Sequence, residues 1–374
     1  MFWRAILKIY SVINKFIAAN VIFCLMAMSR VSCACVADQP PDIGAENGAI
    51  VINAETGDVI YEKDADKVAP MASTTKIMST LIALEQNDLD VPFVVDPDAI
   101  KIEGSSMGLR EGDRVTIRDL CYGMMLPSGN DAANAIAVKI AGSIGEFAQI
   151  MNSKAREIGV KNTNFCTPSG LDISSDDSHH STARDMAILT KKAMENPLFC
   201  EICTKTSKEL FFGNPPQKRT IFNHNKLLKT FPGACGVKTG FTKKAGRCLV
   251  SAAQRDGIKL IAVVLKDHDD WNDSKALLEY GFAKFSLKEL PSDFSEVKLN
   301  IAGQNDQEFG VWPEAVLQIA ATSEMMERVK VKIKTDPFYF YPVNQGDKVG
   351  EAEYFIDEKL IGKVDLCANI NIIQ

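Results

Sequence analysis

The chain is predicted to fold as an α/β protein, with an antiparallel sheet covered by helices and a smaller all-β domain after it. Three features of the 374-residue sequence support this prediction. β-patterned runs stand at both ends of the first three quarters, helical patterns fill the region between them, and beyond Pro291 the apolar residues follow a period of two. This order is typical of one sheet built from both ends of a domain.

The N-terminal residues form a separate pattern. Cationic residues precede an apolar stretch from Phe16 to Met28, and small residues follow it up to Ala37. Residues 1–37 are therefore expected to be a secretory signal peptide, cleaved after Ala37. A retained membrane anchor is the alternative, although the apolar stretch contains an asparagine and is short for a membrane span.

Residues 38–288 are expected to form the first folded domain. Residues 48–62 are predicted to form a β-hairpin around a Thr-Gly-Asp turn. Near the other end, two β-rich runs are separated by Asp256-Gly257, a strong turn signal. The expected strands and helices are strands 247–253 and 258–265 and helices 73–84, 119–126, 131–141, 143–158, a helix opening at Thr182, and 270–285.

Residues 289–374 are expected to form a second, β-rich domain. Val329 to Lys334 alternates strictly between apolar and cationic residues, and two strand runs between Glu351 and Ile370 are hinged at residues 357–359. No catalytic cluster is visible there, so a spacer or docking role is expected. The last residues look like a strand and carry no cationic amphipathic helix, so a C-terminal membrane anchor is expected to be absent.

Three short motifs carry the chemical signal of the first domain. They are Ser73-Thr74-Thr75-Lys76, Ser128-Gly129-Asn130 and Lys238-Thr239-Gly240, in this order. Each is weak alone, but together they supply a nucleophile, a nearby base, a proton-relaying hydroxyl and a cationic strand for a carboxylate. The set predicts a serine acyl-transfer enzyme.

The local context of each motif fits that chemistry. Ser73 follows Pro70 and opens an apolar-periodic stretch, so it is expected at a helix N-terminus with Lys76 one turn further on. The second motif is predicted to form a tight loop between two helices, because Pro127 and glycine interrupt the helical pattern. Lys238 is predicted to lie on an edge strand beside an antiparallel pair.

Longer stretches resemble a known family. Residues 104–113, 118–133, 167–171 and 236–246 are similar to the low-molecular-mass penicillin-binding proteins that act as D-alanyl-D-alanine carboxypeptidases. The likeness runs from about Ala45 to the chain end. It implies the β-lactamase/transpeptidase-like fold with a β-rich second domain, and removal of the terminal D-alanine from peptidoglycan stem pentapeptides without metal or cofactor. β-Lactam antibiotics would act as covalent inhibitors.

The resemblance also implies a role for each motif residue. Ser73 would be the nucleophile, Lys76 the base and Ser128 the proton relay. The residues implied in substrate binding are Asn130, Lys238, Thr239 and Gly240, and the backbone N–H groups of Ser73 and Phe241 would bind the oxyanion.

One position departs from the family pattern. Family members often carry an arginine, just before an asparagine upstream of Lys-Thr-Gly, that helps to bind the substrate carboxylate. The corresponding stretch here is residues 223–228, with His224 in that place. His224 is either a weaker, pH-dependent carboxylate contact or a structural histidine, and the second interpretation is preferred. His179 and His180 precede a helix start and are expected to be loop or cap residues.

Charge and cysteine content restrict the remaining classes of function. The formal net charge of −6 and the dispersed lysines and arginines argue against nucleic-acid binding. Cys200 and Cys203 have the spacing of a metal or redox pair, but no second pair stands at ligand spacing. Cys235 is the candidate for a thiol that faces the cleft. Small core residues are expected at Cys121, Cys248 and Cys367.

Three competing functions are considered. A class A β-lactamase would need a glutamate-bearing E-x-x-L-N loop between the second and third motifs, and none is present. A D,D-endopeptidase that cuts peptidoglycan cross-links is chemically adjacent. A non-catalytic penicillin sensor would signal through transmembrane helices, and none follow the domain in the sequence. Export to the cell wall or periplasmic space, free or peripheral to the membrane, is expected for a carboxypeptidase that acts on peptidoglycan.

Overall fold

The computed structural model describes residues 39–171, 178–302 and 308–372. The expected signal peptide lies outside these residues. From Ile43 onward the chain forms one compact unit. Within the described ranges, every helix is too short or too polar to cross a membrane.

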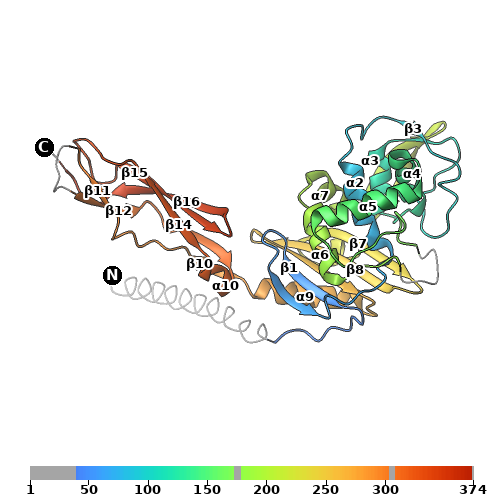
Figure 1. Cartoon of the computed structure of the whole chain (residues 1–374), viewed down its shortest axis with the longest axis horizontal. Coiled ribbons are helices and arrows are strands. Elements are labelled where there is room, and N and C mark those ends of the chain that lie inside the picture. Colours follow the sequence, from blue (N-terminus) through green and yellow to red (C-terminus); the bar gives the residue numbers. More distant parts are fainter. Residues whose placement is uncertain (1–38, 172–177, 303–307, 373–374) are drawn as a thin grey trace, which may run out of the picture. The chain divides into compact units, whose positions relative to one another are not determined.

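A five-stranded antiparallel sheet stands at the centre of the first group of elements (Figure 1). Its strand order is β2-β1-β9-β8-β7, so the N-terminal hairpin pairs through β1 with β9, a strand more than two hundred residues later, as the sequence pattern predicts. The strands are β1 (Ala49–Asn53), β2 (Val59–Lys63), β7 (Ala234–Thr242), β8 (Gly246–Arg255) and β9 (Ile258–Leu265).

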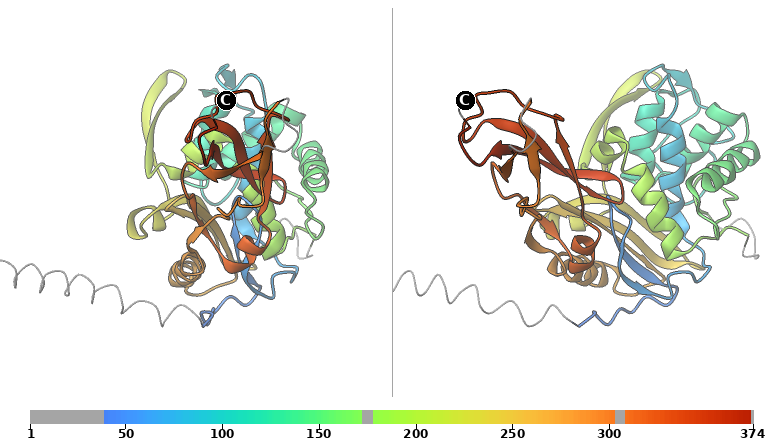
Figure 2. Two further views of the ribbon diagram at one scale, coloured as in Figure 1. Left: turned by 90° about the vertical axis from the view of Figure 1, so that its left-hand side faces the viewer. Right: turned by 60° about the vertical axis from the view of Figure 1, so that its left-hand side comes forward.

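Helices cover both faces of this sheet (Figure 2). On β9, Leu260 and Val264 pack beneath α9 (Asp270–Ala283), whereas Ile261 and Val263 pack beneath the larger helical layer. Alternate residues of a strand face opposite sides, so a strand buried on both faces must be apolar throughout. The larger layer contains α2 (Lys76–Leu84), α3 (Ile117–Met125), α4 (Asn130–Ala141), α5 (Ile144–Ile158), α6 (Ala183–Ala193) and α7 (Pro197–Thr204).

Polar side chains set the starts of these helices. Thr116 forms a complete capping box with Asp119 at the start of α3. Ser143 caps α5 and Thr182 caps α6, each by accepting the backbone N–H three residues ahead. The observed helix limits lie within two residues of the predicted ones, except that α2 begins at Lys76, three residues after the predicted start at Ser73. Thr182, and not His179 or His180, is therefore the cap of α6.

Several elements were not predicted. The largest is the hairpin of β5 (Ser207–Gly213) and β6 (Pro216–Phe222), in which Phe211 and Phe222 are exposed. Apolar residues that alternate along a strand usually face the core, but these two phenylalanines face solvent. The short elements are η1 (Ala72–Thr75), β3 (Phe93–Val94), β4 (Arg114–Val115) and α8 (Leu227–Thr230).

The C-terminal elements form an all-β domain with one short helix, which confirms the predicted fold class. Its main sheet has the order β11-β12-β16-β15-β14 and its own apolar core. The predicted hinge is a tight turn in which Asp357 and Glu358 both have positive φ. The elements are β10 (Ser286–Glu289), β11 (Lys298–Asn300), β12 (Glu308–Pro313), β13 (Gln318–Ala321), α10 (Ser323–Glu327), β14 (Lys330–Thr335), β15 (Lys348–Ile356) and β16 (Lys359–Ala368).

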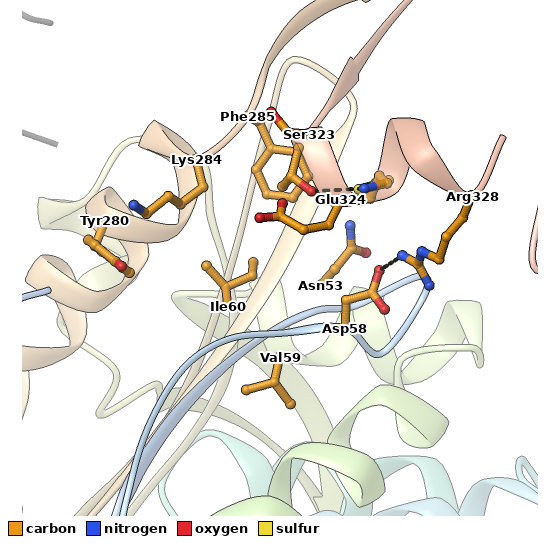
Figure 3. A pocket seen from close by; sticks show the side chains of 12 residues that line it. Asn53, Asp58, Val59, Ile60, Tyr280, Lys284, Phe285, Ser323, Glu324 and Arg328 are labelled. Carbon is orange, nitrogen blue, oxygen red and sulfur yellow. Dashed lines mark hydrogen bonds and ion pairs between the residues drawn. The ribbon is translucent and has the colours of Figure 1, made fainter. Parts of the chain in front are cut away.

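Charged pairs join this domain to the β1–β2 hairpin. Arg328 forms ion pairs with Asp58 and with Asp357, and Lys359 Nζ lies 2.7 Å from Glu55 Oε2. A pocket of about 520 Å³ lies beside Arg328 (Figure 3). These exposed pairs are weak individually.

Candidate active site

Ser73 lies in the 3-10 turn η1, which leads directly into α2. The sequence analysis placed it at the N-terminus of the α-helix itself, and the structure corrects this by one turn. Lys76 is the first residue of α2, and its Nζ lies 2.9 Å from Ser73 Oγ. The preceding residue, Ala72, has a φ of 49°, an uncommon conformation for a residue with a side chain.

The Lys76 amine is completely buried and has three close polar neighbours. Besides Ser73 Oγ, Nζ donates to Asn130 Oδ1 at 2.7 Å and to the Ser169 carbonyl at 2.8 Å. Burial is the main cause that lowers the pKa of Lys76 well below its usual range. Repulsion by Lys238 lowers it further, and attraction by Asp131 opposes both. The surroundings therefore favour a neutral amine.

The second motif forms the predicted turn between α3 and α4. Ser128 has a φ of 63°, and Gly129 N–H donates to the Gly123 carbonyl at 2.8 Å. Asn130 is the first residue of α4 and is held by two hydrogen bonds. Its backbone N–H donates to Ser105 O, and its Nδ2 donates to Glu103 O. This second bond orients the amide so that Oδ1 faces Lys76.

The third motif lies on β7, the edge strand of the sheet, as predicted. Gly240 passes so close to η1 that a Cβ on it would lie 3.1 Å from Met71 O and 3.2 Å from Ser73 N. A side chain there would require η1 to shift by a few tenths of an ångström, so glycine lets the strand lie directly against the turn that carries Ser73. Lys238 is 1% exposed, and burial lowers its pKa to about 7.

The three motifs meet at one cleft of about 470 Å³. Lys76, Asn130 and Lys238 are buried behind it. The predicted site residues that line the cleft are Ser73, Ser128, His224, Thr239, Gly240 and Phe241, and the other lining residues are Ser105, Lys226, Arg247, Asp270 and Trp271.

His224 occupies the cleft wall, with its backbone N–H donating to Leu126 O at 3.2 Å. Burial and then repulsion by Lys238 lower the pKa of its imidazole. A histidine with a lowered pKa is neutral at pH 7 and cannot supply the positive charge of an arginine.

Arg247 is the cationic group that the sequence analysis missed. It stands on β8 opposite Phe241, and its Nε and Nη2 donate to Asp270 Oδ1 at 2.8 and 2.6 Å. Asp270 is buried, whereas the Arg247 side chain remains 44% exposed at the cleft. The short turn after the third motif could have revealed Arg247 in the sequence, because a tight turn there places Arg247 on the strand next to the motif.

None of the seven cysteines in the described part of the chain lines the cleft. Cys121, Cys248 and Cys367 are buried, as predicted. Cys235 was the candidate for a cleft-facing thiol, but it packs with Cys200 against the main core and does not line the cleft. Among the described residues, no group of three or more histidine, cysteine, aspartate or glutamate side chains could hold a metal ion.

Comparison with known proteins agrees with this geometry. Residues 34–269 match a family model described as D-alanyl-D-alanine carboxypeptidase, and residues 285–372 match the C-terminal domain of penicillin-binding protein 5. The chain is 31% identical to D-alanyl-D-alanine carboxypeptidase DacF of Bacillus subtilis over 81% of this chain and 79% of the relative. It is 30% identical to DacC of Escherichia coli over 97% and 93%.

A solved structure extends the likeness to both domains. The D-alanyl-D-alanine carboxypeptidase DacD from Francisella tularensis superimposes with a TM-score of 0.60 at 27% identity, over 91% of this chain and 96% of that one. The chain therefore belongs to the D-alanyl-D-alanine carboxypeptidase family of serine peptidases.

Proposed function

We propose that this protein is a serine-type D-alanyl-D-alanine carboxypeptidase that removes the terminal D-alanine of peptidoglycan stem pentapeptides through an acyl-enzyme on Ser73. One observation carries the proposal, which is the set of contacts around the Lys76 amine. A neutral amine has two hydrogens and one lone pair. Asn130 Oδ1 and Ser169 O can only accept, so they take the two hydrogens and leave the lone pair facing Ser73 Oγ.

In the acylation step, Lys76 takes the Ser73 proton as Oγ attacks the carbonyl carbon of the penultimate D-alanine. A serine hydroxyl needs such an adjacent base at neutral pH. The negative charge that forms on the carbonyl oxygen is stabilised by the backbone N–H groups of Ser73 and Phe241, which border the cleft. The C–N bond then breaks, and Ser128 relays the proton to the amine of the departing D-alanine.

The leaving D-alanine carries a carboxylate, which needs donors and positive charge. Thr239 and Arg247 line the cleft on the strands next to Phe241. A guanidinium presents five donors, and Asp270 occupies two of those of Arg247 while others remain for a substrate carboxylate. We assign the carboxylate contact to Arg247 with Thr239, in place of His224. Lys238 and Asn130 support the site from behind, and water finally hydrolyses the acyl-enzyme.

The cellular setting follows from the proposed substrate. Peptidoglycan lies outside the cytoplasmic membrane, so residues 1–37 are proposed to be an export signal, followed by a catalytic domain of residues 38–288 and a β-rich domain of residues 289–374. β-Lactams, which imitate the acyl-D-alanyl-D-alanine end, are proposed to acylate Ser73 and to be released slowly.

A single assay tests the proposal against its alternatives. The purified protein is incubated with a pentapeptide ending in D-Ala-D-Ala and, separately, with cross-linked dimeric muropeptide, and released D-alanine and monomer are measured by mass spectrometry. We expect D-alanine release that Ser73→Ala abolishes. Cleavage of the dimer alone would favour the endopeptidase, and labelling of Ser73 by penicillin without either cleavage would favour the sensor.

A further inference from the structure

His179 is a buried polar residue that the mechanism above does not use. It is 8% exposed and makes two hydrogen bonds through its ring. The backbone N–H of Cys166 donates to Nδ1 at 2.9 Å, and Nε2 lies 2.8 Å from Thr75 Oγ1. Phe165 packs edge-on against the ring.

These contacts determine the tautomer of the imidazole. Nδ1 accepts a backbone N–H, so it carries no proton. The Thr75 hydroxyl donates its own hydrogen to Ala72 O at 2.8 Å, so Thr75 Oγ1 must accept from His179. The ring is therefore neutral with its proton on Nε2, and every polar atom of the chain of bonds is satisfied.

One end of this chain of bonds is the turn that carries the nucleophile. Thr75 belongs to the S-x-x-K motif, and Ala72, which accepts its hydroxyl, precedes Ser73 and has a positive φ. A residue with a side chain keeps such a conformation only where its surroundings hold it there. His179 orients Thr75, and Thr75 holds the carbonyl of Ala72.

The other end is the segment that supports the base. Cys166 is followed by Ser169, whose carbonyl accepts from Lys76, and by Gly170, which has a φ of 81°. A Cβ on Gly170 would lie 1.9 Å from Ala72 O, so this segment is in direct contact with the turn that carries Ser73. His179 thus joins the support of Ser73 to the support of Lys76.

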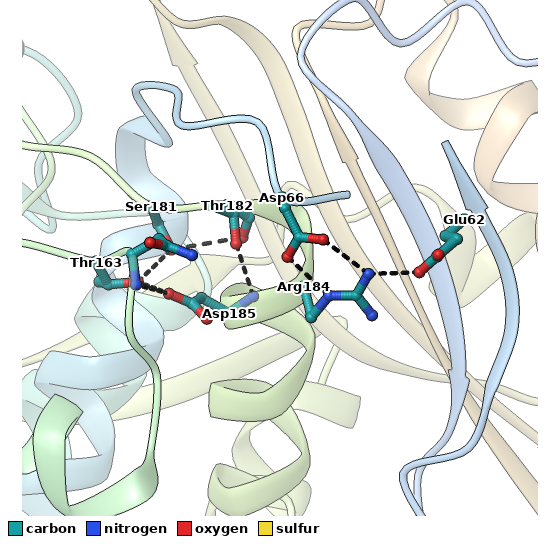
Figure 4. A network of polar contacts seen from close by, with 8 residues as sticks. Glu62, Asp66, Thr163, Ser181, Thr182, Arg184 and Asp185 are labelled. Carbon is teal, nitrogen blue, oxygen red and sulfur yellow. Dashed lines mark hydrogen bonds and ion pairs between the residues drawn. The ribbon is translucent and has the colours of Figure 1, made fainter. Parts of the chain in front are cut away.

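The backbone next to His179 forms hydrogen bonds with the residues just before each of these two segments. His180 pairs with Asn164 and Ser181 pairs with Ala69, each through two backbone hydrogen bonds. Figure 4 shows the side-chain network that continues from Ser181 through Thr163 to Asp185 on α6. The imidazole is therefore presented from a rigid strand-like segment.

We propose that His179 is a positioning residue, which sets the conformation of the turn carrying Ser73 relative to the carbonyl that holds Lys76. The inference rests on the proposed acyl-enzyme at Ser73. An imidazole is suited to this place because Nδ1 accepts a hydrogen bond on one side of the ring while Nε2 donates one on the other. Burial, with a smaller contribution from His180, lowers the pKa of His179 to about 4, so both bonds persist at neutral pH.

The test compares His179→Phe, Thr75→Val and the double variant with Thr75→Ser, which keeps the hydroxyl, and Cys166→Ala, which keeps the backbone N–H. Acylation by a fluorescent penicillin and turnover of the pentapeptide are measured at a temperature where each variant is folded by circular dichroism. We expect each of the first two variants to acylate about 10 to 100 times more slowly, with KM changed less than about threefold.

The double variant should be no more than about threefold slower than the slower single variant, because both changes break one chain of bonds. Thr75→Ser and Cys166→Ala should stay within about threefold of the unchanged protein. Unchanged acylation in Thr75→Val, or two effects that multiply in the double variant, would overturn the inference. If His179→Phe does not fold, the contrast between Thr75→Val and Thr75→Ser decides. Absence of Ser73 labelling in the unchanged protein would instead overturn the proposed function.

Discussion

Lysines of the cleft and lysines of the C-terminal sheet stand in opposite environments. Lys76 and Lys238 are buried next to each other, and both have lowered pKa values. Lys363, on β16, is exposed between Glu351 and Glu353, and the hydrogen bonds to these carboxylates raise its pKa. The surroundings thus favour the neutral form of lysine in the cleft and the charged form on the sheet.

The neutral lysine amine is the property of the site that requires a folded protein. A charged ammonium is strongly penalised when it leaves water, so burial alone favours the neutral amine. A second lysine adds repulsion. On the exposed sheet water and carboxylates stabilise the charge, and each ion pair contributes little. Substitutions that move a lysine from one environment towards the other test the comparison.

The largest effect is expected from Lys76→Arg. Arginine can occupy part of the same space but keeps its proton, so it cannot act as a base. We expect acylation of Ser73 by a fluorescent penicillin to slow by about 10² to 10⁴. Lys363→Arg is the matched control and should acylate at the normal rate. Normal acylation in Lys76→Arg would show that another group takes the serine proton.

Lys238→Met should have the next largest effect. It removes the repulsion that helps to lower the Lys76 pKa, so the acid limb of the pH–rate profile should move to higher pH. The acylation rate at pH 7 should fall about 10- to 100-fold. A pH profile of unchanged position would remove Lys238 as a perturber of Lys76.

The same variant should be more stable than the unchanged protein at neutral pH. The unfolded chain binds a proton at Lys238 below about pH 10.5, but the folded protein binds one only below about pH 7. Stability is therefore lost as the pH falls from 10.5 to 7, and on the order of a few kcal/mol is at stake. Thermal unfolding should show a higher Tm for Lys238→Met at pH 7 and a smaller gain at pH 10. A lower Tm at pH 7 would contradict this.

Arg247 is an intermediate case, a half-exposed cation held by a buried carboxylate. Arg247→Ala should raise KM for the pentapeptide about tenfold and change kcat less, because one charged contact to the substrate carboxylate is lost. Arg118→Ala is the control, because Arg118 also makes two hydrogen bonds to a carboxylate but does not line the cleft. Steady-state kinetics measure both. An unchanged KM would exclude Arg247 from carboxylate recognition.

The smallest effect is expected from Glu353→Gln on the C-terminal sheet. Lys334 and Lys363 lower the pKa of Glu353 to about 2, so its contribution is present above about pH 4.5 and is lost as the pH falls towards 2. The Glu353 side chain is only 6% exposed, but its partners Lys334 and Lys363 are about half exposed, so water screens both pairs and Tm at pH 7 should fall by about 2 °C or less. Activity should be unchanged. A large loss of Tm would show that this pair is not a surface pair.

The sheet, the main helices and the second domain could be predicted because their signals are local. The Asp256-Gly257 turn and the apolar run of β9 are visible in one stretch of sequence. The β5–β6 hairpin was missed because Phe211 and Phe222 point outward, which disguises its polarity pattern. The 3-10 turn at Ser73 was missed because tertiary contacts to Gly240 shape it.

The candidate site likewise contains residues that the sequence reveals and residues that only the fold brings there. Its three motifs are short enough to be found in sequence, whereas Arg247 reaches the cleft only through strand pairing with Phe241. His179 reaches the nucleophile turn through a partner 104 residues away. Both residues are brought to the site by the fold and belong to none of the three motifs, and for Arg247 the only sequence signal was the short turn that precedes it.

The protonation state of Lys76 can be measured directly by NMR. In protein labelled with ¹³C at the lysine side chains, the Lys76 signal is assigned by its absence from Lys76→Arg, and its chemical shift is followed with pH. The account predicts that Lys76 titrates well below the surface lysines, with Lys363 above its ordinary value. Titration of Lys76 together with the surface lysines would contradict the claim that the fold prepares a neutral base beside Ser73.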